Sequence, residues 1–316
     1  MKPTPSLFKR LLLAAALATV LLATVTAYDA FASRRVLTAH PAPGQVLDLG
    51  DTEIHAICRG HAEPTLVLFH GYGGGAIDWL PLMDELAPNH RVCALDRPGN
   101  DYSPPVATDA NGILRMLHSA IEQLHIEKPF VVGHSLGGAF ALRYAAEYPV
   151  AGLILVDGLS PDVADQVTQR LGSYVSLVPL AKLGLLRPLA GSFVHASYST
   201  DLYGQMLSLR SRGSAIAAMA AEGAIARSEL GTAALRRAEA DLRSPLLVLA
   251  AGATDVPEGE AFAQSLQAFA SRTTNSAAVI IPDAGHYLIN THAHEIAAQI
   301  DAWVTNPATT AKAVHP

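Results

Sequence analysis

The sequence has few cysteines, few charged residues and no cluster of basic residues. Only two cysteines, Cys58 and Cys93, occur in 316 residues, which is too few for a disulfide scaffold or a cysteine-based zinc site. Charged residues make up 16% of the chain and its formal net charge is -6. Such a chain has no general electrostatic attraction to phosphate backbones. We therefore expect no nucleic-acid partner.

The first 35 residues are predicted to be an export element. Basic residues at positions 2, 9 and 10 precede an uncharged run from Leu11 to Ala27 that is rich in Leu, Ala and Val. Its length lies between a signal-peptide core of about 7 to 15 residues and a spanning helix of about 17 to 25. Small residues at 30–33 could serve a signal peptidase, but they lie several residues beyond the apolar run. The spacing favours a retained membrane anchor over a cleaved signal peptide.

The basic residues before the apolar run also predict a topology. A positive amino end stays in the cytoplasm, so the body from about Val36 onward is expected on the non-cytoplasmic side. The predicted location is the cell envelope, with the body either membrane-anchored or exported. The alternative is a buried N-terminal helix of a cytosolic protein, which is disfavoured because that helix would be apolar on every side.

Beyond the leader, apolar runs alternate with helical patterns. The runs predict eight strands, at residues 45–49, 53–58, 65–69, 91–95, 130–132, 153–156, 246–250 and 279–281. The turn-forming pair Gly50 and Asp51 predicts a hairpin between the first two. Helical spacing occurs between later strands, most clearly over residues 111–124. The expected fold class is therefore α/β, with a mostly parallel eight-stranded sheet and helices on both faces.

The alternation stops between about residues 159 and 239, where the sequence is rich in Ala, Leu, Ser and Gly and has no strand-like run. This segment is interpreted as an inserted helical cap. The predicted organisation is an anchor over residues 1–35, a core in two parts, 36–158 and 241–306, a cap over 159–240, and a tail over 307–316.

The sequence Gly133-His134-Ser135-Leu136-Gly137 lies between a predicted buried strand and a predicted helix. A sharp strand-to-helix turn strains the serine backbone and needs flanking residues without side chains. Such a turn exposes the serine hydroxyl as a nucleophile. It also directs the backbone N–H of Leu136 toward an oxygen that becomes negative during attack. Ser135 is therefore the predicted nucleophile.

A second glycine-rich segment, residues 70–75, follows the strand that ends at Phe69. An oxyanion needs two N–H donors, and this loop is predicted to supply the second from the backbone of Tyr72. His70 is expected to hydrogen-bond within the loop rather than take part in the chemistry.

A serine hydroxyl needs a base, and the base needs a carboxylate that orients it. Among 13 histidines, His286 follows the last predicted strand and precedes a helix, so it is the predicted base. Two aspartates follow predicted buried strands, Asp157 directly and Asp255 after several turn residues. Asp255 is preferred because the longer turn leaves its carboxylate room to reach the imidazole.

The chain order Ser135, Asp255, His286, with the elbow and the earlier His-Gly loop, resembles the α/β-hydrolase family. The resemblance covers about residues 45–304. It implies a serine hydrolase with a cap after the sixth strand. A family turn is matched at residues 96–103, except that Asp101 replaces its second glycine. By the family's strand order, the strands that carry Cys58 and Cys93 are neighbours, which allows either a cross-strand disulfide or two buried thiols.

The expected function is esterase- or lipase-like hydrolysis of an ester-like bond in a small or medium apolar substrate, through an acyl-enzyme. Thioester, lactone, peptide and perhydrolase chemistry remain open, because the same triad serves all of them. The alternative from another class is a non-catalytic protein that holds a small ligand beneath the cap. No cofactor and no metal ion are expected. The predicted partners are the small-molecule substrate and, through the N-terminal segment, a membrane.

Overall fold

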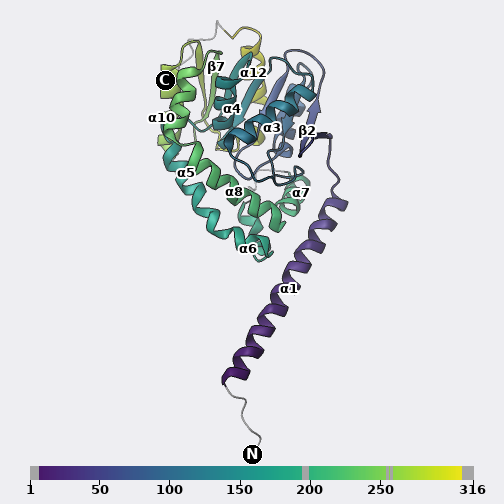
Figure 1. Ribbon diagram of the computed structural model, residues 1–316. Helices are drawn as coiled ribbons and strands as arrows, with labels where there is room; N and C mark the ends of the chain where they lie inside the picture. Colours follow the sequence, from purple (N-terminus) through teal and green to yellow (C-terminus); the bar gives the residue numbers. More distant parts are fainter. Residues whose placement is uncertain (1–6, 194–198, 254–255, 257–258, 308–316) are drawn as a thin grey trace, which may run out of the picture.

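The computed structural model describes residues 7–193, 199–253, 256 and 259–307. Its centre is an eight-stranded sheet with the order β1-β2-β4-β3-β5-β6-β7-β8 (Figure 1). The strands are β1 (Gln45–Asp48), β2 (Glu53–Arg59), β3 (Leu66–Phe69), β4 (Val92–Leu95), β5 (Phe130–His134), β6 (Gly152–Val156), β7 (Leu246–Ala251) and β8 (Ser276–Ile281). All eight predicted strands are present. The last begins at Ser276 rather than Val279, because this edge strand is only partly buried and its first half lacks a continuous apolar run.

The strand pairings confirm the mostly parallel sheet. β1 pairs with β2, and β2 with β4, in antiparallel register, while all other neighbours are parallel. Cys58 of β2 lies directly opposite Cys93 of β4. The two form a disulfide with a Cα–Cα distance of 4.1 Å. Of the two alternatives for these cysteines, the structure therefore has the cross-strand bond.

Helices cover both faces of the sheet, and each face has its own apolar core. One core joins the sheet to α3 (Ala110–Gln123), α4 (Leu136–Glu147), α9 (Thr232–Asp241) and α10 (Gly259–Arg272). The opposite core contains η1 (Ala76–Trp79), α2 (Leu80–Leu86), α11 (Leu288–Thr291) and α12 (Ala293–Val304). Figure 1 shows α3 and α4 in front of the sheet and α12 behind it. The central strands are buried on both faces, which explains their uninterrupted apolar runs.

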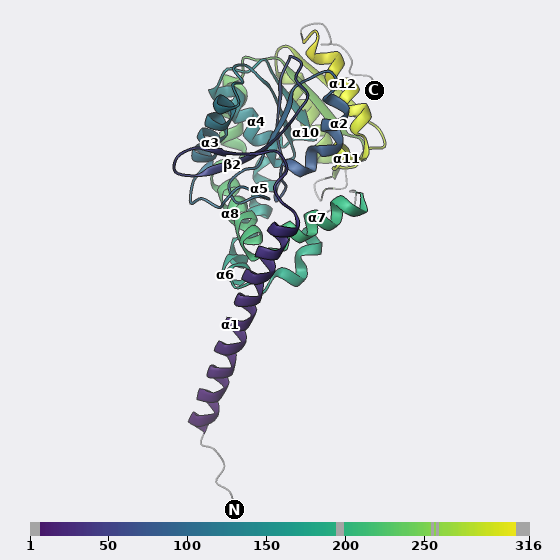
Figure 2. The same ribbon diagram turned by 90° about the vertical axis from the view of Figure 1, so that its right-hand side faces the viewer.

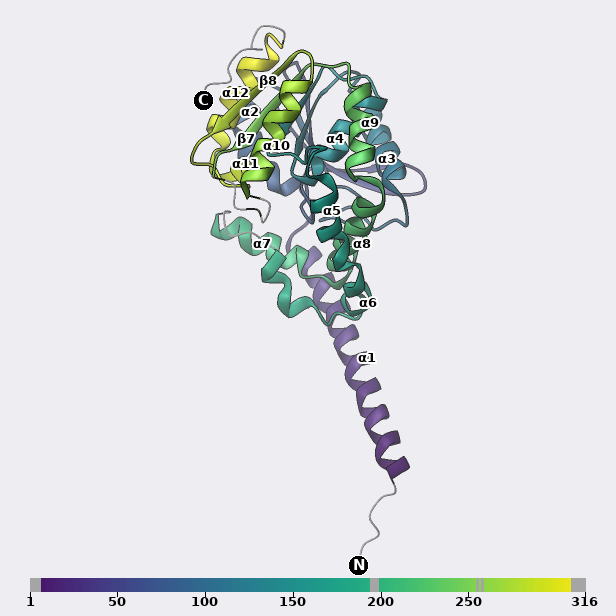
Figure 3. The ribbon, with the colours of Figure 1, turned by 90° about the vertical axis from the view of Figure 1, so that its left-hand side faces the viewer.

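Between β6 and β7 the described residues form helices and no strand. They are α5 (Ala164–Gly172), η2 (Ser173–Leu177), α6 (Val178–Lys182), η3 (Arg187–Phe193), α7 (Thr200–Arg210), α8 (Gly213–Glu229) and α9. Seen from the other two sides, α5 to α8 gather at one end of the sheet (Figures 2 and 3). We refer to α5 to α8, with η2 and η3, as the cap, because they cover the carboxyl ends of the central strands.

The N-terminal segment is one long helix, α1 (Leu7–Ala39), which extends away from the body beside the cap (Figures 1 and 2). It has no buried residue. By length and mean hydropathy, 2.1 over its most apolar window, it is long and apolar enough to cross a membrane. A signal sequence would also meet that criterion.

Candidate active site

Ser135 lies at a strained turn between β5 and α4. Its φ of 52° and ψ of -126° fall outside the regions that residues with a side chain ordinarily occupy. The turn is possible because its flanking residues are glycines. A Cβ at Gly133 would lie 2.5 Å from the Gly137 carbonyl oxygen, and one at Gly137 would lie 2.1 Å from that of Phe69. This is the strand-turn-helix elbow that the sequence predicts.

The structure brings His286 to Ser135. The histidine lies in the loop after β8, and its Nε2 is 2.9 Å from Ser135 Oγ. Its Nδ1 is 2.6 Å from Asp157 Oδ2. A carboxylate only accepts hydrogen bonds, so Nδ1 carries the proton and Nε2 is the acceptor for the serine hydroxyl. This tautomer is the one that can deprotonate a serine.

Among the described residues, the carboxylate that contacts His286 is Asp157, the second of the two aspartates weighed from the sequence, and the preference for Asp255 stays a prediction. Asp255 itself lies outside the described residues. Asp157 directly follows β6, has a φ of 43° and is fully buried. Its backbone oxygen accepts from the Ser135 N–H, and its Oδ1 accepts from the Ala251 N–H at 3.1 Å. A short turn suffices because the strained backbone, rather than a longer loop, aims the carboxylate at the imidazole.

His134 holds the backbone of His286. Its Nε2 donates to the His286 carbonyl oxygen at 2.8 Å. Complete burial lowers the pKa of His134 to about 3, with a further contribution from the neighbouring His286. The ring is therefore neutral at pH 7, as a buried imidazole without a carboxylate partner should be. His134 supports the site and does not face the serine hydroxyl.

The predicted oxyanion loop lies against the elbow. A Cβ at Gly71 would be 3.2 Å from the Ser135 Cβ, and both Tyr72 and Leu136 line the cavity that contains Ser135 and His286. Leu136 is the first residue of α4, where backbone N–H groups have no partner within the helix. The two N–H groups predicted to hold an oxyanion thus belong to residues that line the same cavity as Ser135.

His70 anchors this loop, as the sequence analysis expected. Its Nδ1 donates to the Gly71 carbonyl oxygen at 2.8 Å, and its Nε2 accepts from the Arg97 N–H at 3.1 Å. Burial lowers the pKa of His70 well below its ordinary value, and the Arg97 charge lowers it further. A neutral ring with these two partners fixes the carboxyl end of β3.

A buried ion pair that the sequence analysis missed joins the loop to the cap. The Arg97 guanidinium binds the carbonyl oxygens of His70 and Gly71, at 2.5 and 2.9 Å. Its Nε also donates to Glu222 of α8 at 2.6 Å. Arg97 and Glu222 are 1% and 4% exposed, and a carboxylate is rarely buried so fully without such a partner. No sequence signal links two residues 125 positions apart.

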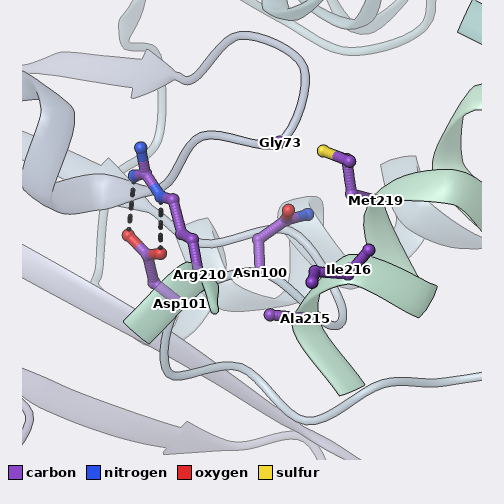
Figure 4. Close-up of a pocket in the computed structure, with 7 residues that line it drawn as sticks. All are labelled: Gly73, Asn100, Asp101, Arg210, Ala215, Ile216 and Met219. Carbon is purple, nitrogen blue, oxygen red and sulfur yellow. Dashed lines mark hydrogen bonds and ion pairs between the residues drawn. The ribbon is translucent and has the colours of Figure 1, made fainter. Parts of the chain in front are cut away.

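A second cap-to-core contact involves Asp101, the residue that departs from the family turn. Asp101 takes a φ of 35°, and its carboxylate binds Arg210 of α7 at 3.1 and 3.0 Å. Figure 4 shows this pair beside a cavity that Gly73 and Met219 also line. An aspartate tolerates the left-handed conformation better than most residues. The turn shape therefore survives the loss of the glycine, and the carboxylate binds the cap.

The cavity at Ser135 is small, about 50 Å³, and mostly apolar. Core and cap both contribute to its wall, which consists of Tyr72, Ser135, Leu136, Leu159, Val167, Arg170, Leu171, Val256, Phe262 and His286. Within the described ranges, no group of three or more His, Cys, Asp or Glu residues is placed to hold a metal ion. The arrangement joins a hydroxyl, an imidazole and a carboxylate in one hydrogen-bonded series, which suits nucleophilic attack on a carbonyl carbon.

Comparison with known proteins identifies relatives of the same fold. A model described as the alpha/beta hydrolase family matches residues 66–299. The abhydrolase domain-containing protein abhd-5.2 of Caenorhabditis elegans is 32% identical over 175 residues, which cover 48% of this chain and 39% of that protein. The 2-hydroxy-6-oxononadienedioate/2-hydroxy-6-oxononatrienedioate hydrolase of Cupriavidus pinatubonensis is 34% identical over 122 residues, 34% of this chain and 42% of that protein. The chain thus spans less than half the length of these curated relatives.

Solved structures resemble the body more completely. Cfl2 of Burkholderia cenocepacia superposes with a TM-score of 0.68 at 22% identity, covering 82% of this chain and 95% of that one. The enol-lactonase of Burkholderia xenovorans LB400 gives 0.63 at 18% identity, covering 83% and 100%. At such identities the likeness shows the fold alone.

Proposed function

The chain belongs to the alpha/beta hydrolase family, and on this premise we propose that it is a serine hydrolase that cleaves an ester-like bond through an acyl-enzyme. The observation that carries the proposal is the hydrogen-bonded series Ser135, His286 and Asp157 at the carboxyl edge of the sheet. The strained backbone at Ser135 supports it, because such strain persists mainly where function requires it.

In the proposed mechanism His286 Nε2 takes the proton of Ser135 as Oγ attacks the substrate carbonyl carbon. The carbonyl oxygen becomes negative and receives hydrogen bonds from the N–H groups of Tyr72 and Leu136. When this intermediate collapses, the bond to the leaving group breaks and His286 donates its proton to that group. Water, deprotonated by the same imidazole, then releases the acid product and restores the serine. Asp157 stabilises the imidazolium in both halves.

The cavity supports an apolar acyl group. Leu159, Phe262 and the α5 residues Val167 and Leu171 form its apolar walls. Its volume of about 50 Å³ is several times the roughly 10 to 15 Å³ that one water needs on the same measure, so the cavity can receive a small acyl group. Carboxylic esters fit this chemistry, and thioesters, lactones and amides would use the same groups.

A hydroxyl substitution tests the proposal. We expect Ser135→Ala to lower the turnover of p-nitrophenyl esters by about 10⁶-fold, as for other intact triads, and to abolish labelling by a fluorophosphonate probe. Ser228→Ala, at an exposed serine of α8, is the matched control and should leave both readouts unchanged. A wild-type protein that binds apolar ligands but is neither labelled nor active would instead be the non-catalytic binding protein.

The same proposal includes a location in the cell envelope, with α1 as a retained anchor and the body on the non-cytoplasmic side. Residues Leu7 to Thr24 are all exposed, so the body leaves this apolar stretch uncovered. The basic residues before it favour a cytoplasmic amino end. The disulfide between Cys58 and Cys93 supports an oxidising compartment for the body.

A further inference from the structure

The C-terminal part of α1, from residue 25 onward, packs on the body along one face. Its half-buried residues recur at three- and four-residue intervals, at Val25, Thr26, Asp29, Ala32, Ser33 and Val36. That spacing forms a single stripe on a helix. Every residue from Leu7 to Thr24 is exposed. Contact with the body therefore begins at residue 25.

Polar contacts fasten this stripe to the cap. Arg187 of η3 donates from Nε to Asp29 at 2.8 Å and from Nη2 to Ser33 at 2.8 Å. Thr26 donates to the carbonyl oxygen of Leu183 at 3.3 Å. At Gly184, whose φ is +75°, a Cβ would lie only 2.5 Å from the Asp29 Cβ. The loop that follows α6 is thus pressed directly against α1.

If α1 spans a bilayer, these contacts fix the distance between the cap and the membrane surface. The uncharged run Leu11 to Ala27 is about 25 Å long at 1.5 Å per residue, close to the roughly 30 Å of a hydrocarbon core. Asp29 is the first acidic residue after it. If α1 spans the bilayer, the outer boundary of the hydrocarbon lies near residue 27. The loop at Leu183 and Gly184 lies at that boundary, because it touches Thr26 and Asp29.

The cap exposes apolar side chains on both sides of this loop in the sequence. Val175, Leu180, Leu185 and Leu189 are 41 to 57% exposed. In the described body beyond α1, the remaining exposed large hydrophobic residues, Val46, Val106 and Ile280, lie scattered in the chain. Figures 1 and 3 show α6 at the end of the body that lies beside the extending part of α1. We call residues 175–189 the cap tip.

We infer that the cap tip is a membrane-docking surface, and that the lipid bilayer spanned by α1 is its occupant. The inference rests on the proposed anchor and goes beyond it. An anchor alone does not require any contact between the body and the lipid. Exposed leucines at the level of the headgroups bury apolar area there, and the exposed Lys182 among them suits anionic lipids. The cap tip follows α5, whose Val167 and Leu171 line the cavity at Ser135, so docking brings that cavity wall toward the lipid.

Tryptophan fluorescence in vesicles tests the docking surface. The full chain carrying Leu185→Trp is reconstituted into vesicles of phosphatidylcholine and phosphatidylglycerol with brominated acyl chains, which quench tryptophans that enter the hydrocarbon. Ile280→Trp, at an equally exposed residue of the edge strand β8, is the matched control on the same tether. The native Trp79 and Trp303 are buried and give a common background. We expect the Leu185→Trp signal to be quenched at least threefold more than that of the control, and equal quenching would overturn the inference.

Two further variants distinguish docking on lipid from self-association of the chain. Arg187→Gln in the Leu185→Trp chain removes the ion pair with Asp29 and should reduce the extra quenching by half or more. If the extra quenching is absent and Leu185→Asp abolishes a dimer seen by sedimentation in detergent, the surface binds a second copy and the inference is wrong. Circular dichroism verifies that each variant is folded. Quenching does not depend on turnover, so a wild-type chain without esterase activity would refute the proposed function and leave this result standing.

Discussion

Two strained residues at neighbouring strand ends position the side chains that contact His286. Ser135 and Asp157 follow His134 and Val156, which are partners in the parallel register of β5 and β6, and both have positive φ. The Ser135 N–H donates to the Asp157 carbonyl oxygen at 3.2 Å. Positive φ costs of the order of 1 to 3 kcal/mol for a residue with a side chain. The fold thus contains two strained residues at adjacent positions. The proposed chemistry requires their side chains to point in fixed directions.

The identity of the orienting acid leads to a prediction at this scale. The Asp157 carboxylate accepts one hydrogen bond from the Ala251 N–H and another from His286 Nδ1–H. In Asp157→Asn only one of these two acceptors remains, because the amide has a single oxygen. By analogy with other triads, we expect it to lower kcat/KM by about 10⁴. Asp255→Asn is the comparison variant. Ester hydrolysis by the two variants decides between them, and a severe loss at Asp255 with a mild one at Asp157 would restore the original assignment.

His134 predicts a dependence of stability on pH. Its pKa is about 3 in the fold, against an ordinary 6.5 in the unfolded chain. A lowered pKa means that the neutral ring stabilises the fold fully above pH 6.5, and that this contribution is lost as the pH falls toward 3. At pH 5 the loss amounts to about 2 kcal/mol, at about 1.4 kcal/mol per pKa unit.

Urea unfolding at pH 7.5 and pH 5 measures this contribution. In His134→Gln the decrease in unfolding free energy between the two pH values should be smaller by about 2 kcal/mol. Burial raises the pKa values of Asp78 and Asp96, which acts in the opposite direction but equally in both proteins. His61→Gln, at an exposed histidine, is the control. Identical pH dependence in wild type and His134→Gln would contradict the prediction.

At the scale of elements, three ion pairs between described residues couple the cap to the core. Glu222 of α8 holds Arg97, which binds the oxyanion loop, and Arg210 of α7 holds Asp101 and Asp78 of the core. Asp78 in turn accepts from the Gly75 N–H at the end of that loop, at 2.9 Å. Both ends of residues 70–75 are therefore connected to the cap. A displacement of α7 or α8 would therefore shift residues 70–75 through these buried ion pairs.

Glu222→Gln tests this connection. Removing one charge of a buried pair costs about 3 kcal/mol or more, because the partner is left uncompensated. We expect that loss in urea unfolding, together with a decrease in kcat for esters as the Tyr72 N–H loses its fixed position. Glu147→Gln breaks an exposed pair with Arg143 and should change stability by less than about 0.5 kcal/mol. A lower stability with unchanged kcat would mean that Glu222 is structural only.

For the whole molecule, the disulfide is the only covalent link across the described sheet. It closes a loop with a sequence separation of 35, and a loop of that size stabilises a fold by about 3 to 4 kcal/mol. We expect the double variant Cys58→Ala with Cys93→Ala to lose about that much in urea unfolding. The non-reduced wild-type protein, once denatured, should show no thiol toward Ellman's reagent. Two reactive thiols would show that the cysteines are not paired.

The fate of the leader is also decided at this scale. Cleavage after Ala32 would remove Asp29 and expose the guanidinium of Arg187, whose side chain is now 16% exposed. We therefore expect the protein isolated from membranes to retain residues 1–32, as measured by intact mass and N-terminal peptides. Asp29→Asn should leave the chain in the membrane but lower the thermal stability of the body. A mature chain that begins at Ser33 would contradict the retained anchor and, with it, the docking of the cap tip.

Much of the molecule could be predicted from local patterns. The eight strands follow from uninterrupted apolar runs, because strands covered on both faces need no polar side. The elbow follows from Gly133 and Gly137, because only glycine fits beside the strained serine. Asp157 and Asp255 both follow predicted strands, and a sequence does not show which of two strand ends reaches His286, 129 positions from Asp157.

By itself, then, the sequence determined the sheet, the elbow and the apolar leader, because each depends on the backbone sterics or apolar surface of neighbouring residues. The tertiary structure alone decided which carboxylate meets His286, that Cys58 and Cys93 face each other, and that Glu222 and Asp29 find arginines of distant segments. These outcomes depend on the register of paired strands and on the packing of the cap. Register and packing are set by contacts between segments far apart in the chain, and no local pattern contains them.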